Sequence, residues 1–376
     1  MKKHHIVIDA RVRRASTGRY IAQLVEHLQN VDHFHRYTIL VQPDDDWKMR
    51  AGNFKTVPCP FPQFSFNPLH EIRFTRQLYK LKADLVHFAM TQQPLLYFGN
   101  IVTTTHDLIM FDFARPGRTP RPIFWVKMLL YRFLFFWSHL KSKRIIVPTK
   151  FVAADLKRYQ PWDNKKVVVT YEAALPPLTG KGEPVEDVRE PFLLYVSNVF
   201  PHKNADNLVK AFDILHQTRP SLQLVLVGKK EQYYERLAKL VATLPAADHI
   251  LMPGFKAYVT DQQLKWLYER CAAYVYPSLA DGFGLSPLEA MTHDAPVVVS
   301  EASCLPEVCG PAAHYCNPHS PRDIAEKVDE VLSSKKLRDQ LVAAGKERLK
   351  LFSWQKMADE TLLVYESLLA PAEENG

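Results

Sequence analysis

A glycine-containing loop between an expected strand and an expected helix carries the residue types best suited to chemistry. The loop holds Asp281, Gly282 and Gly284, and the helix is expected to begin near Pro287 because proline suits a first helical turn. Backbone N–H groups in such a loop can bind anions or sugar hydroxyls. Asp281 and Glu289 are eight residues apart, so a loop residue and a residue one turn into the helix can face one pocket. The alternative is that Asp281 caps the helix and Glu289 is solvated.

No metal site is expected. Cys304, Cys309 and Cys316 are separated by five and seven positions, without the paired short spacing of a zinc site. The five cysteines of the chain are an odd number in a long sequence, which favours reduced, buried thiols and a reducing compartment. The acidic run Asp44–Asp46 is interpreted as a solvated turn.

Strand-like runs alternate with helix-length amphipathic segments along the chain, which is typical of parallel sheets wrapped by helices. Strands are expected at 6–10, 37–41, 85–88, 101–105, 144–148, 167–171, 192–196, 222–227, 250–252, 273–276 and 295–299. Helices are expected at 18–28, 70–80, 122–140, 150–159, 204–216, 232–243, 260–270, 284–292, 321–333, 336–350 and 354–369. This pattern predicts an α/β protein of two Rossmann-like domains with ligands at the carboxyl ends of the strands.

A Pro- and Gly-containing stretch, Ala173–Asp187, is the best candidate linker. The predicted division is an N-terminal domain over 1–175, a linker over 176–190, a C-terminal domain over 191–352 and a final helix in 353–376. Residues 1–180 hold 27 basic and 13 acidic residues, and residues 181–376 hold 21 and 27, which together give the net charge of +8. The basic half is therefore expected to favour phosphate, anionic lipid or another anionic partner.

The loop and its surroundings resemble the family 4 retaining glycosyltransferases, in which two acidic residues enclose a Gly-Phe-Gly-Leu loop. The resemblance continues through Tyr195–Asn204, Pro296–Ser300 and Leu305–Val308, and through Phe352–Trp354 near the end. In the first half, short motifs at 8–11, 17–20 and 105–108 resemble the mannosyltransferase-like branch. The resemblance implies the GT-B arrangement: an acceptor domain and a nucleotide-sugar donor domain facing each other across a cleft, with the last helix crossing back to the first domain.

The resemblance also implies roles for residues of the second half. Lys203 would pair with the donor diphosphate beside a helix N-terminus, and Glu289 would accept both ribose hydroxyls. Asp281 would reach hydroxyls of the transferred sugar. The remaining donor-side residues that it implies are Asn198, His202, Gly254, Gly282, Phe283, Gly284, Leu285 and Glu307. For Glu307, capping of a short helix is an equal alternative.

Three positions depart from the family pattern. Asp281 stands where the family has glutamate. This difference is compatible with a wider pocket, a different sugar or weaker activity. Asn198 stands where the family often has arginine, and His202 where arginine is common. Phosphate neutralisation is therefore expected to rest on Lys203 and on backbone amides.

In the first half, the resemblance places His106 close to the transferred sugar; the alternative is a loop histidine capped by Asp107. Gly18 permits close approach of the backbone to a phosphate or to the acceptor. Arg11, Thr17, Arg19 and Asp107 are expected on the acceptor side.

The aromatic and basic stretch Arg121–Lys143 leaves two interpretations open. Its apolar residues surround nearly the whole helix, which favours burial in the core. Alternatively, it is an interfacial helix with apolar residues in the acyl boundary and basic residues on anionic headgroups. The apolar run 124–137 is too short to span a bilayer, which takes about 20 residues.

The predicted activity is metal-independent transfer of a hexose, with mannose from GDP-mannose favoured, to a glycan or lipid-linked hydroxyl acceptor in polysaccharide synthesis. Catalysis would rest on His106, Lys203 and Asp281. A UDP-sugar enzyme, an epimerase or phosphorylase of the same fold, and a non-catalytic glycan-binding or nucleotide-binding module are the alternatives. The N-terminus lacks a secretory pattern, so a cytoplasmic protein at the inner face of the membrane is expected, and no nucleic-acid motif is present.

Overall fold

The computed structural model describes residues 2–14, 17–62, 67–115, 119–161, 165–228, 232–255 and 257–370. The chain forms two compact units. Unit 1 comprises residues 1–108, 114–172 and 353–376, and unit 2 comprises residues 109–113 and 173–352. Residues 170–191, which connect the sheet of unit 1 to that of unit 2, form neither helix nor strand.

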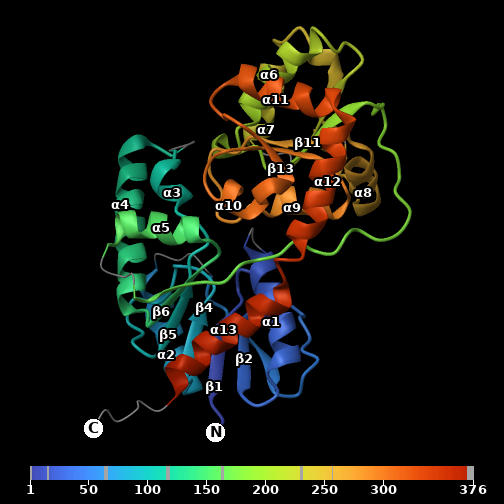
Figure 1. Ribbon diagram of the computed structural model, residues 1–376. Helices are drawn as coiled ribbons and strands as arrows, with labels where there is room; N and C mark the ends of the chain where they lie inside the picture. Colours follow the sequence, from blue (N-terminus) through green and yellow to red (C-terminus); the bar gives the residue numbers. More distant parts are fainter. Residues whose placement is uncertain are drawn as a thin grey trace. The chain divides into compact units, whose positions relative to one another are not determined.

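Unit 1 is built on a seven-stranded parallel sheet with the order β3-β2-β1-β4-β5-β6-β7. The strands of this sheet that Figure 1 labels lie side by side. Its strands are β1 (His5–Asp9), β2 (Arg36–Val41), β3 (Phe54–Pro58), β4 (Leu85–Phe88), β5 (Ile101–Thr104), β6 (Arg144–Val147) and β7 (Val167–Val169). Its helices are α1 (Gly18–Val31), α2 (Pro68–Leu81), α4 (Arg121–Lys141), α5 (Lys150–Tyr159) and α13 (Trp354–Leu369).

Unit 2 is built on a six-stranded parallel sheet with the order β10-β9-β8-β11-β12-β13. Its strands are β8 (Phe192–Val196), β9 (Gln223–Val227), β10 (Ile250–Leu251), β11 (Ala273–Tyr276), β12 (Val297–Ser300) and β13 (Ala313–Cys316). Its α-helices are α3 (Ile109–Asp112), α6 (Ala205–His216), α7 (Gln232–Val241), α8 (Asp261–Arg270), α9 (Leu285–Thr292), α10 (Leu305–Cys309), α11 (Pro321–Ser333) and α12 (Lys335–Leu349). Short 3-10 turns cover η1 (Pro201–Lys203), η2 (Ala247–His249), η3 (Pro253–Phe255) and η4 (Gly310–Ala312).

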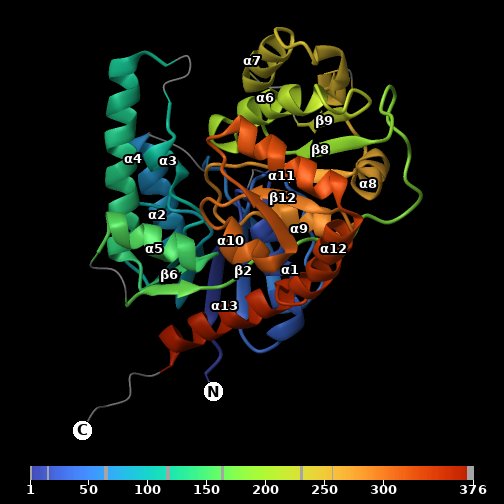
Figure 2. The ribbon, with the colours of Figure 1, turned by 45° about the horizontal axis from the view of Figure 1, so that its top comes forward.

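Both sheets follow from the composition of their strands. Val297–Val299 and Leu193–Leu194 lie on inner strands of unit 2 and are buried, because helices cover both faces of a parallel sheet. Polar side chains start several of the helices: Thr149 accepts from the Val152 amide at 3.1 Å, and Thr260 and Gln263 form a capping box. In Figure 2, α11 lies beside α6 and α12 beside α9, and each of these helix pairs is in contact.

The predicted α/β class with two Rossmann-like units is confirmed by the two doubly wound parallel sheets. Predicted and observed helices agree at 150–159 and 321–333. The prediction missed β3, which lies at the sheet edge and ends in Pro58, and it missed β13, whose sequence is Ala-His-Tyr-Cys. A proline or polar residues within a short run obscure the strand pattern.

The last helix, α13, belongs to unit 1, where it lies beside α1. Buried Tyr365 of α13 is 2.6 Å from Nδ1 of His87 in β4, and Nε2 of His87 is 2.8 Å from the Thr104 hydroxyl. Burial lowers the pKa of His87 to about 3. His87 is therefore neutral and connects α13 to the middle of the sheet by hydrogen bonds alone.

We expect Tyr365→Phe to lower the free energy of unfolding by about 1–3 kcal/mol, because it leaves a buried polar atom of His87 without its partner. Urea unfolding of the full chain measures the change. Tyr258→Phe is the matched control, since Tyr258 is exposed, and it should change stability by less than about 0.5 kcal/mol. Equal stability of Tyr365→Phe and the parent chain would show that this hydrogen bond does not hold α13 in place.

Candidate active site

The strand order of unit 2 reverses between β8 and β11, which are neighbours in the sheet but far apart in the sequence. Chain connections leave on opposite sides of the sheet at such a point, and ligands bind outside the carboxyl ends of the strands there. The loop after β8 contains Asn198 and the η1 turn with His202 and Lys203, and the loop after β11 contains Asp281. The fold therefore brings two sequence-predicted segments together.

Lys203 and Asp281 form an ion pair at this point, with Nζ 2.6 Å from Oδ2. Each side chain is only 15% exposed. The Tyr276 hydroxyl donates to the same Oδ2 at 2.7 Å, and the Gly282 amide donates to Oδ1 at 3.1 Å. Both oxygens of Asp281 therefore accept hydrogen bonds from groups that the two loops position.

These contacts decide the charges of the site. Burial alone would raise the pKa of Asp281, but the Lys203 ammonium and the hydrogen bonds from Lys203 and Tyr276 outweigh it and place the pKa below its ordinary value. Burial and the charge of Lys203 lower the pKa of His202 to about 4. Near neutral pH, Asp281 is an anion and His202 is neutral, so His202 adds no positive charge for a phosphate.

Asn204 fixes the two loops to each other. It has a positive φ of 61° at the start of α6, a conformation that asparagine tolerates better than most residues. Its buried amide donates to the carbonyl oxygens of Pro277 and Pro318 at 2.9 and 2.7 Å. The sequence placed Asn204 at the end of the family-like segment Tyr195–Asn204 and at the start of an expected helix, but it did not predict this structural role.

The loop from Asp281 to Leu285 is held by backbone conformation and by packing. Gly284 has φ +85°, a backbone conformation that favours glycine. A Cβ there would also come within 2.7 Å of a terminal methyl group of Leu305, which would have to shift. Phe283 is buried, and its ring meets that of Phe352 edge to face at 5.5 Å. Glu289 lies one turn into α9, which begins directly after this loop.

Two further glycines follow strands of the same sheet. A Cβ on Gly228, which follows β9, would come within 2.6 Å of the Ser197 carbonyl oxygen. A Cβ on Gly254, which follows β10, would come within 2.5 Å of the Gly228 carbonyl oxygen. The loops after β8, β9 and β10 therefore approach each other backbone to backbone. Gly254 was predicted and Gly228 was missed, because single glycines outside a motif carry little information.

Glu307 lies in α10, and its backbone carbonyl and that of Val308 accept hydrogen bonds from the Arg348 guanidinium of α12. Arg348 also lies over the Phe352 ring at 5.2 Å. Arg348 therefore links α10 to the ring pair of Phe283 and Phe352. No motif in the sequence pointed to Arg348.

In unit 1, the predicted His106 follows β5 and lies between two acceptor oxygens. Its Nε2 is 3.0 Å from the Ala89 carbonyl oxygen and its Nδ1 is 3.4 Å from Oε1 of Glu172. Burial alone would lower the pKa of His106, but the hydrogen bond and charge of Glu172 raise it above its ordinary value. The raised pKa therefore extends to higher pH the range in which His106 is protonated. Glu172 was not predicted, because it precedes the linker and lies 66 residues from His106.

The predicted acceptor-side residues lie around the start of α1 and the end of β1. Arg11 is buried and donates to both oxygens of Asp9 at 2.8 and 2.7 Å, so its charge is already compensated within unit 1. Gly18 begins α1 where any Cβ would overlap the Arg13 carbonyl. The Thr17 hydroxyl is buried and has no hydrogen-bond partner among the described residues. The other two, Arg19 and Asp107, are partly exposed.

Asp44 and Asp46 are exposed, as predicted for a solvated turn, but Asp45 is not. Asp45 is paired with Arg13, and the Asp45 side chain is nearly inaccessible to solvent. Asp44 is paired with exposed Arg14 at 2.5 Å. Across the part of the chain that the structure describes, no group of three or more His, Cys, Asp or Glu residues could hold a metal ion.

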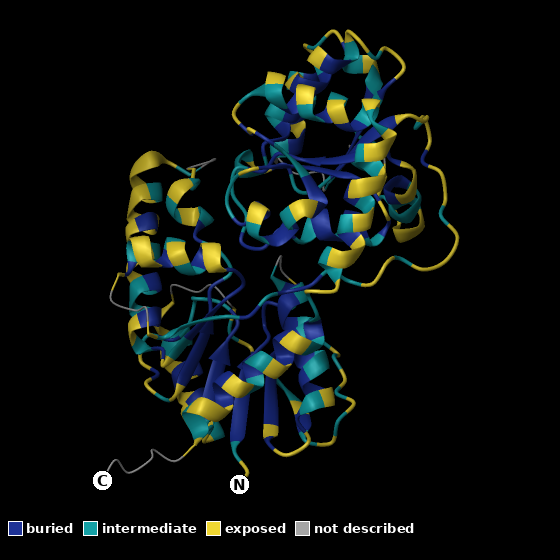
Figure 3. Ribbon diagram, in the orientation of Figure 1, coloured by how far each residue is buried: buried dark blue, intermediate teal, exposed yellow. Residues whose placement is uncertain are grey.

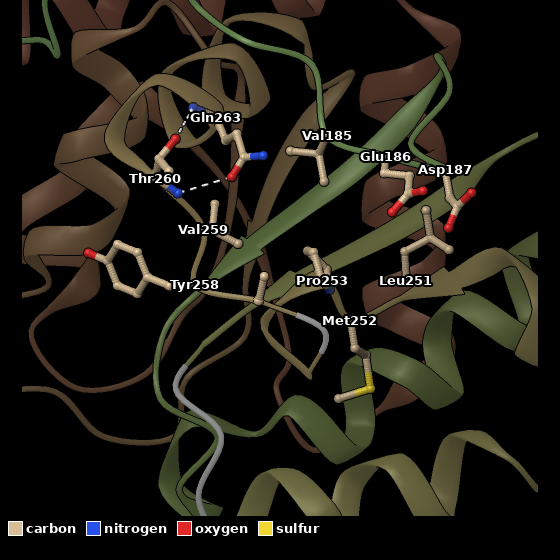
Figure 4. A pocket seen from close by; sticks show the side chains of 11 residues that line it. Val185, Glu186, Asp187, Leu251, Met252, Pro253, Tyr258, Val259, Thr260 and Gln263 are labelled. Carbon is tan, nitrogen blue, oxygen red and sulfur yellow. Dashed lines mark hydrogen bonds between the residues drawn. The ribbon is translucent and has the colours of Figure 1, made fainter.

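A cavity of about 230 Å³ lies along the edge strand β10 in unit 2 (Figure 4). Glu186 and Asp187 of the connecting segment line one part of it, and Thr260 and Gln263 line another. Ligand pockets are usually larger, about 300–1,000 Å³. The cavity lies beside the Gly254 turn and was not foreseen from the sequence.

Comparisons with known proteins agree with this arrangement. The family model described as Glycosyl transferases group 1 matches residues 181–348, and the model described as Glycosyltransferase Family 4 matches residues 17–173. The chain belongs to the family 4 glycosyltransferases and has their GT-B fold of two Rossmann-like units.

Individual relatives and solved structures are similar to the chain. The chain is 29% identical to O-antigen chain mannosyltransferase B of Escherichia coli over 276 residues, which are 71% of this chain and 70% of that protein. It is 28% identical to O-antigen chain mannosyltransferase RfbU of Salmonella typhimurium over 60% of this chain and 63% of that protein. The structure of Anabaena Alr3699/HepE in complex with UDP and glucose shares the fold, with a TM-score of 0.72 and 13% identity over 97% of this chain and all of that chain.

We expect Asp281→Asn to lower the free energy of unfolding by about 2 kcal/mol at pH 7, the scale of a hydrogen bond to a charged group. Because the folded-state pKa of Asp281 is depressed, its stabilisation is present above the unfolded pKa of about 3.9 and is lost as the pH falls through the folded value. Urea unfolding at a series of pH values should therefore show the two proteins converging in acid.

The control is Asp339→Asn, which breaks an exposed pair with Lys335 and should cost less than about 1 kcal/mol. A difference between Asp281→Asn and the parent protein that stayed constant down to pH 3 would contradict the assigned ion pair.

Proposed function

We propose that the protein transfers mannose from GDP-mannose to a hydroxyl group of a glycan or lipid-linked acceptor, with retention at the anomeric carbon and without a metal ion. The observation that carries the proposal is the Lys203–Asp281 pair at the point where the strand order of unit 2 reverses. The mannosyltransferase relatives support mannose as the transferred sugar. The reaction belongs to cell-surface polysaccharide or glycoconjugate synthesis.

The donor diphosphate is held by Lys203 and by backbone amides of the Gly282–Leu285 loop. An ammonium carries three donors, so Lys203 can contact a phosphate oxygen while it donates to Asp281. His202, with its pKa lowered to about 4, supplies no second cation near neutral pH. The single fixed charge of Lys203 and the loop dipoles stabilise the charge that develops on the leaving diphosphate.

Asp281 has two functions in this proposal. It holds Lys203 in the conformation that receives the phosphate, and it reaches a hydroxyl of the transferred sugar through the acceptor positions that an ionised carboxylate retains. Glu289, one turn into α9, accepts the two ribose hydroxyls. Asn198, Gly254 and Glu307 complete the donor side.

In the transfer step, the bond between the anomeric carbon and the diphosphate oxygen breaks as the acceptor oxygen bonds to the same face of the carbon. The acceptor proton passes to the departing diphosphate. His106, which its raised pKa keeps protonated to higher pH between Glu172 and Ala89, contributes positive charge near the sugar and does not act as a base. Gly18, at the start of α1, belongs to the donor side, and Arg11, Thr17, Arg19 and Asp107 form the acceptor side.

The proposed setting is the cytoplasm, at the inner face of the cytoplasmic membrane, where a lipid-linked acceptor is accessible. The excess of basic residues in the first half supports an anionic surface as partner, and no nucleic acid takes part. None of the described helices is long and apolar enough to cross a membrane.

A UDP-sugar donor is the second candidate, supported by the HepE structure with UDP and glucose on the same fold. The departures at Asp281 and Asn198 support a third, in which the protein binds a nucleotide sugar or glycan without catalysis.

The test combines donor titration with a transfer assay. We expect isothermal titration calorimetry to show tighter binding of GDP than of UDP, and incubation with GDP-mannose and a lipid-linked glycan acceptor to yield a mannosylated product. Glu289→Gln should weaken GDP binding by about tenfold or more, because hydrogen bonds to a charged group contribute about 1.5–3 kcal/mol each.

Glu347→Gln is the control for the loss of one carboxylate, since Glu347 lies on the exposed side of α12. Tighter binding of UDP would replace the GDP proposal by the UDP one. Binding of the donor without transfer to any of a panel of acceptors would favour the non-catalytic module.

A further inference from the structure

One long face of α4 in unit 1 is apolar and exposed. Trp125, Val126 and Leu129 are 65%, 67% and 71% exposed. We define the α4 apolar face as Ile123, Trp125, Val126, Leu129, Phe133 and Leu140, all of which are exposed. Figure 3 shows the exposed positions along α4 beside the buried strands of the same unit. Soluble monomers rarely expose contiguous apolar patches of this kind unless they bind something.

Burial of this helix in the core was one interpretation of the sequence. The structure buries only the side of α4 that lies opposite the α4 apolar face. Met128, Phe135, Ser138 and His139 are its buried residues. At about 100° per residue, they lie opposite the α4 apolar face. One side of α4 therefore packs on unit 1, and the opposite apolar side is exposed.

The apolar surface continues beyond the helix. The Trp137 indole donates to the Leu95 carbonyl at 3.0 Å, and the Phe98 ring meets Trp137 edge to face at 6.3 Å. Both Leu96 and Phe98 are exposed. These contacts fix the Leu96–Phe98 loop beside α4 and extend the exposed apolar area.

The charged residues of the segment 121–144 have one sign. Residues 121–144 contain no acidic residue. Arg121, Lys127 and Arg132 of α4 are exposed, and helical geometry places Arg121 and Arg132 along one edge of the apolar face and Lys127 along the other. Lys143, directly after the helix, is also exposed.

We propose that the α4 apolar face is a docking surface for an anionic lipid bilayer, with the helix lying in the interface. Its apolar side chains would enter the boundary between headgroups and acyl chains, and the basic residues at its edges would contact anionic headgroups. Two copies of the face packed together would bring like charges into contact, which disfavours self-association. The proposal does not rest on the assigned sugar donor, since docking is measured without nucleotide sugar.

The first experiment measures co-sedimentation of the full chain with two kinds of vesicle. One is phosphatidylcholine alone, and the other contains about 30 mol% phosphatidylglycerol, which gives the surface a negative charge like that of a cytoplasmic leaflet. We expect binding to the anionic vesicles and little to the neutral ones. Val126→Ser/Leu129→Ser should reduce the binding at least about tenfold, since burial of each such side chain contributes about 1.5–3 kcal/mol. Leu351→Ser/Leu363→Ser is the matched control, because both leucines are exposed outside α4, and it should bind as the parent protein does.

The second experiment tests the charged edges. Lys127→Gln and Arg132→Gln should each weaken binding roughly fivefold, the equivalent of about 1 kcal/mol per basic residue near the surface, and Lys336→Gln in exposed α12 should not. Circular dichroism verifies that each variant is folded.

Equal binding to neutral and anionic vesicles, or equal binding by Val126→Ser/Leu129→Ser and its control, would overturn the proposal. So would the absence of vesicle binding, together with concentration-dependent dimers that the same double variant abolishes; that result would assign the face to a second copy of the chain.

Discussion

The contact of Lys203 with Asp281 depends on a constraint of topology: β8 and β11 are adjacent in the sheet although residues 197–272 lie between them in the sequence. A buried cation and a buried anion are each costly alone, and they are tolerated because the paired strands deliver them to within 2.6 Å. Two nearby residues hold the loops that carry this contact. Asn204 ties the two loops together, and Gly284 allows the chain to turn into α9 directly after Asp281.

Residues that are far apart in the sequence are also joined by hydrogen bonds in unit 1. Tyr365 of the last helix reaches His87, and His87 reaches Thr104, which is 3.0 Å from the Tyr20 hydroxyl. The Tyr20 ring then meets the His106 ring edge to face at 4.8 Å. The C-terminal helix thus supports the elements that surround the candidate catalytic histidine, which explains why a helix from the far end of the chain belongs to this unit.

The sequence predicted the parts whose information is local. Strand-like apolar runs indicated the inner strands, amphipathic segments indicated helices such as α5 and α11, and the Gly-Phe-Gly-Leu loop indicated the candidate site. The edge strand β3 was missed because its strand conformation depends on pairing with β2 and is not evident in its own sequence pattern. Glu172 and Arg348 were missed for a related reason. Each acts through a contact with a residue at least 40 positions away, and no spacing rule reports such contacts.

The central claim is that the donor diphosphate binds at Lys203 and the Gly282–Leu285 loop. A crystal structure of the protein with GDP-mannose tests it most directly. We expect diphosphate oxygens within hydrogen-bond distance of Lys203 Nζ and of the loop amides, with the ribose hydroxyls on Glu289. A nucleotide bound in the cavity along β10, or with its phosphates away from Lys203, would contradict it.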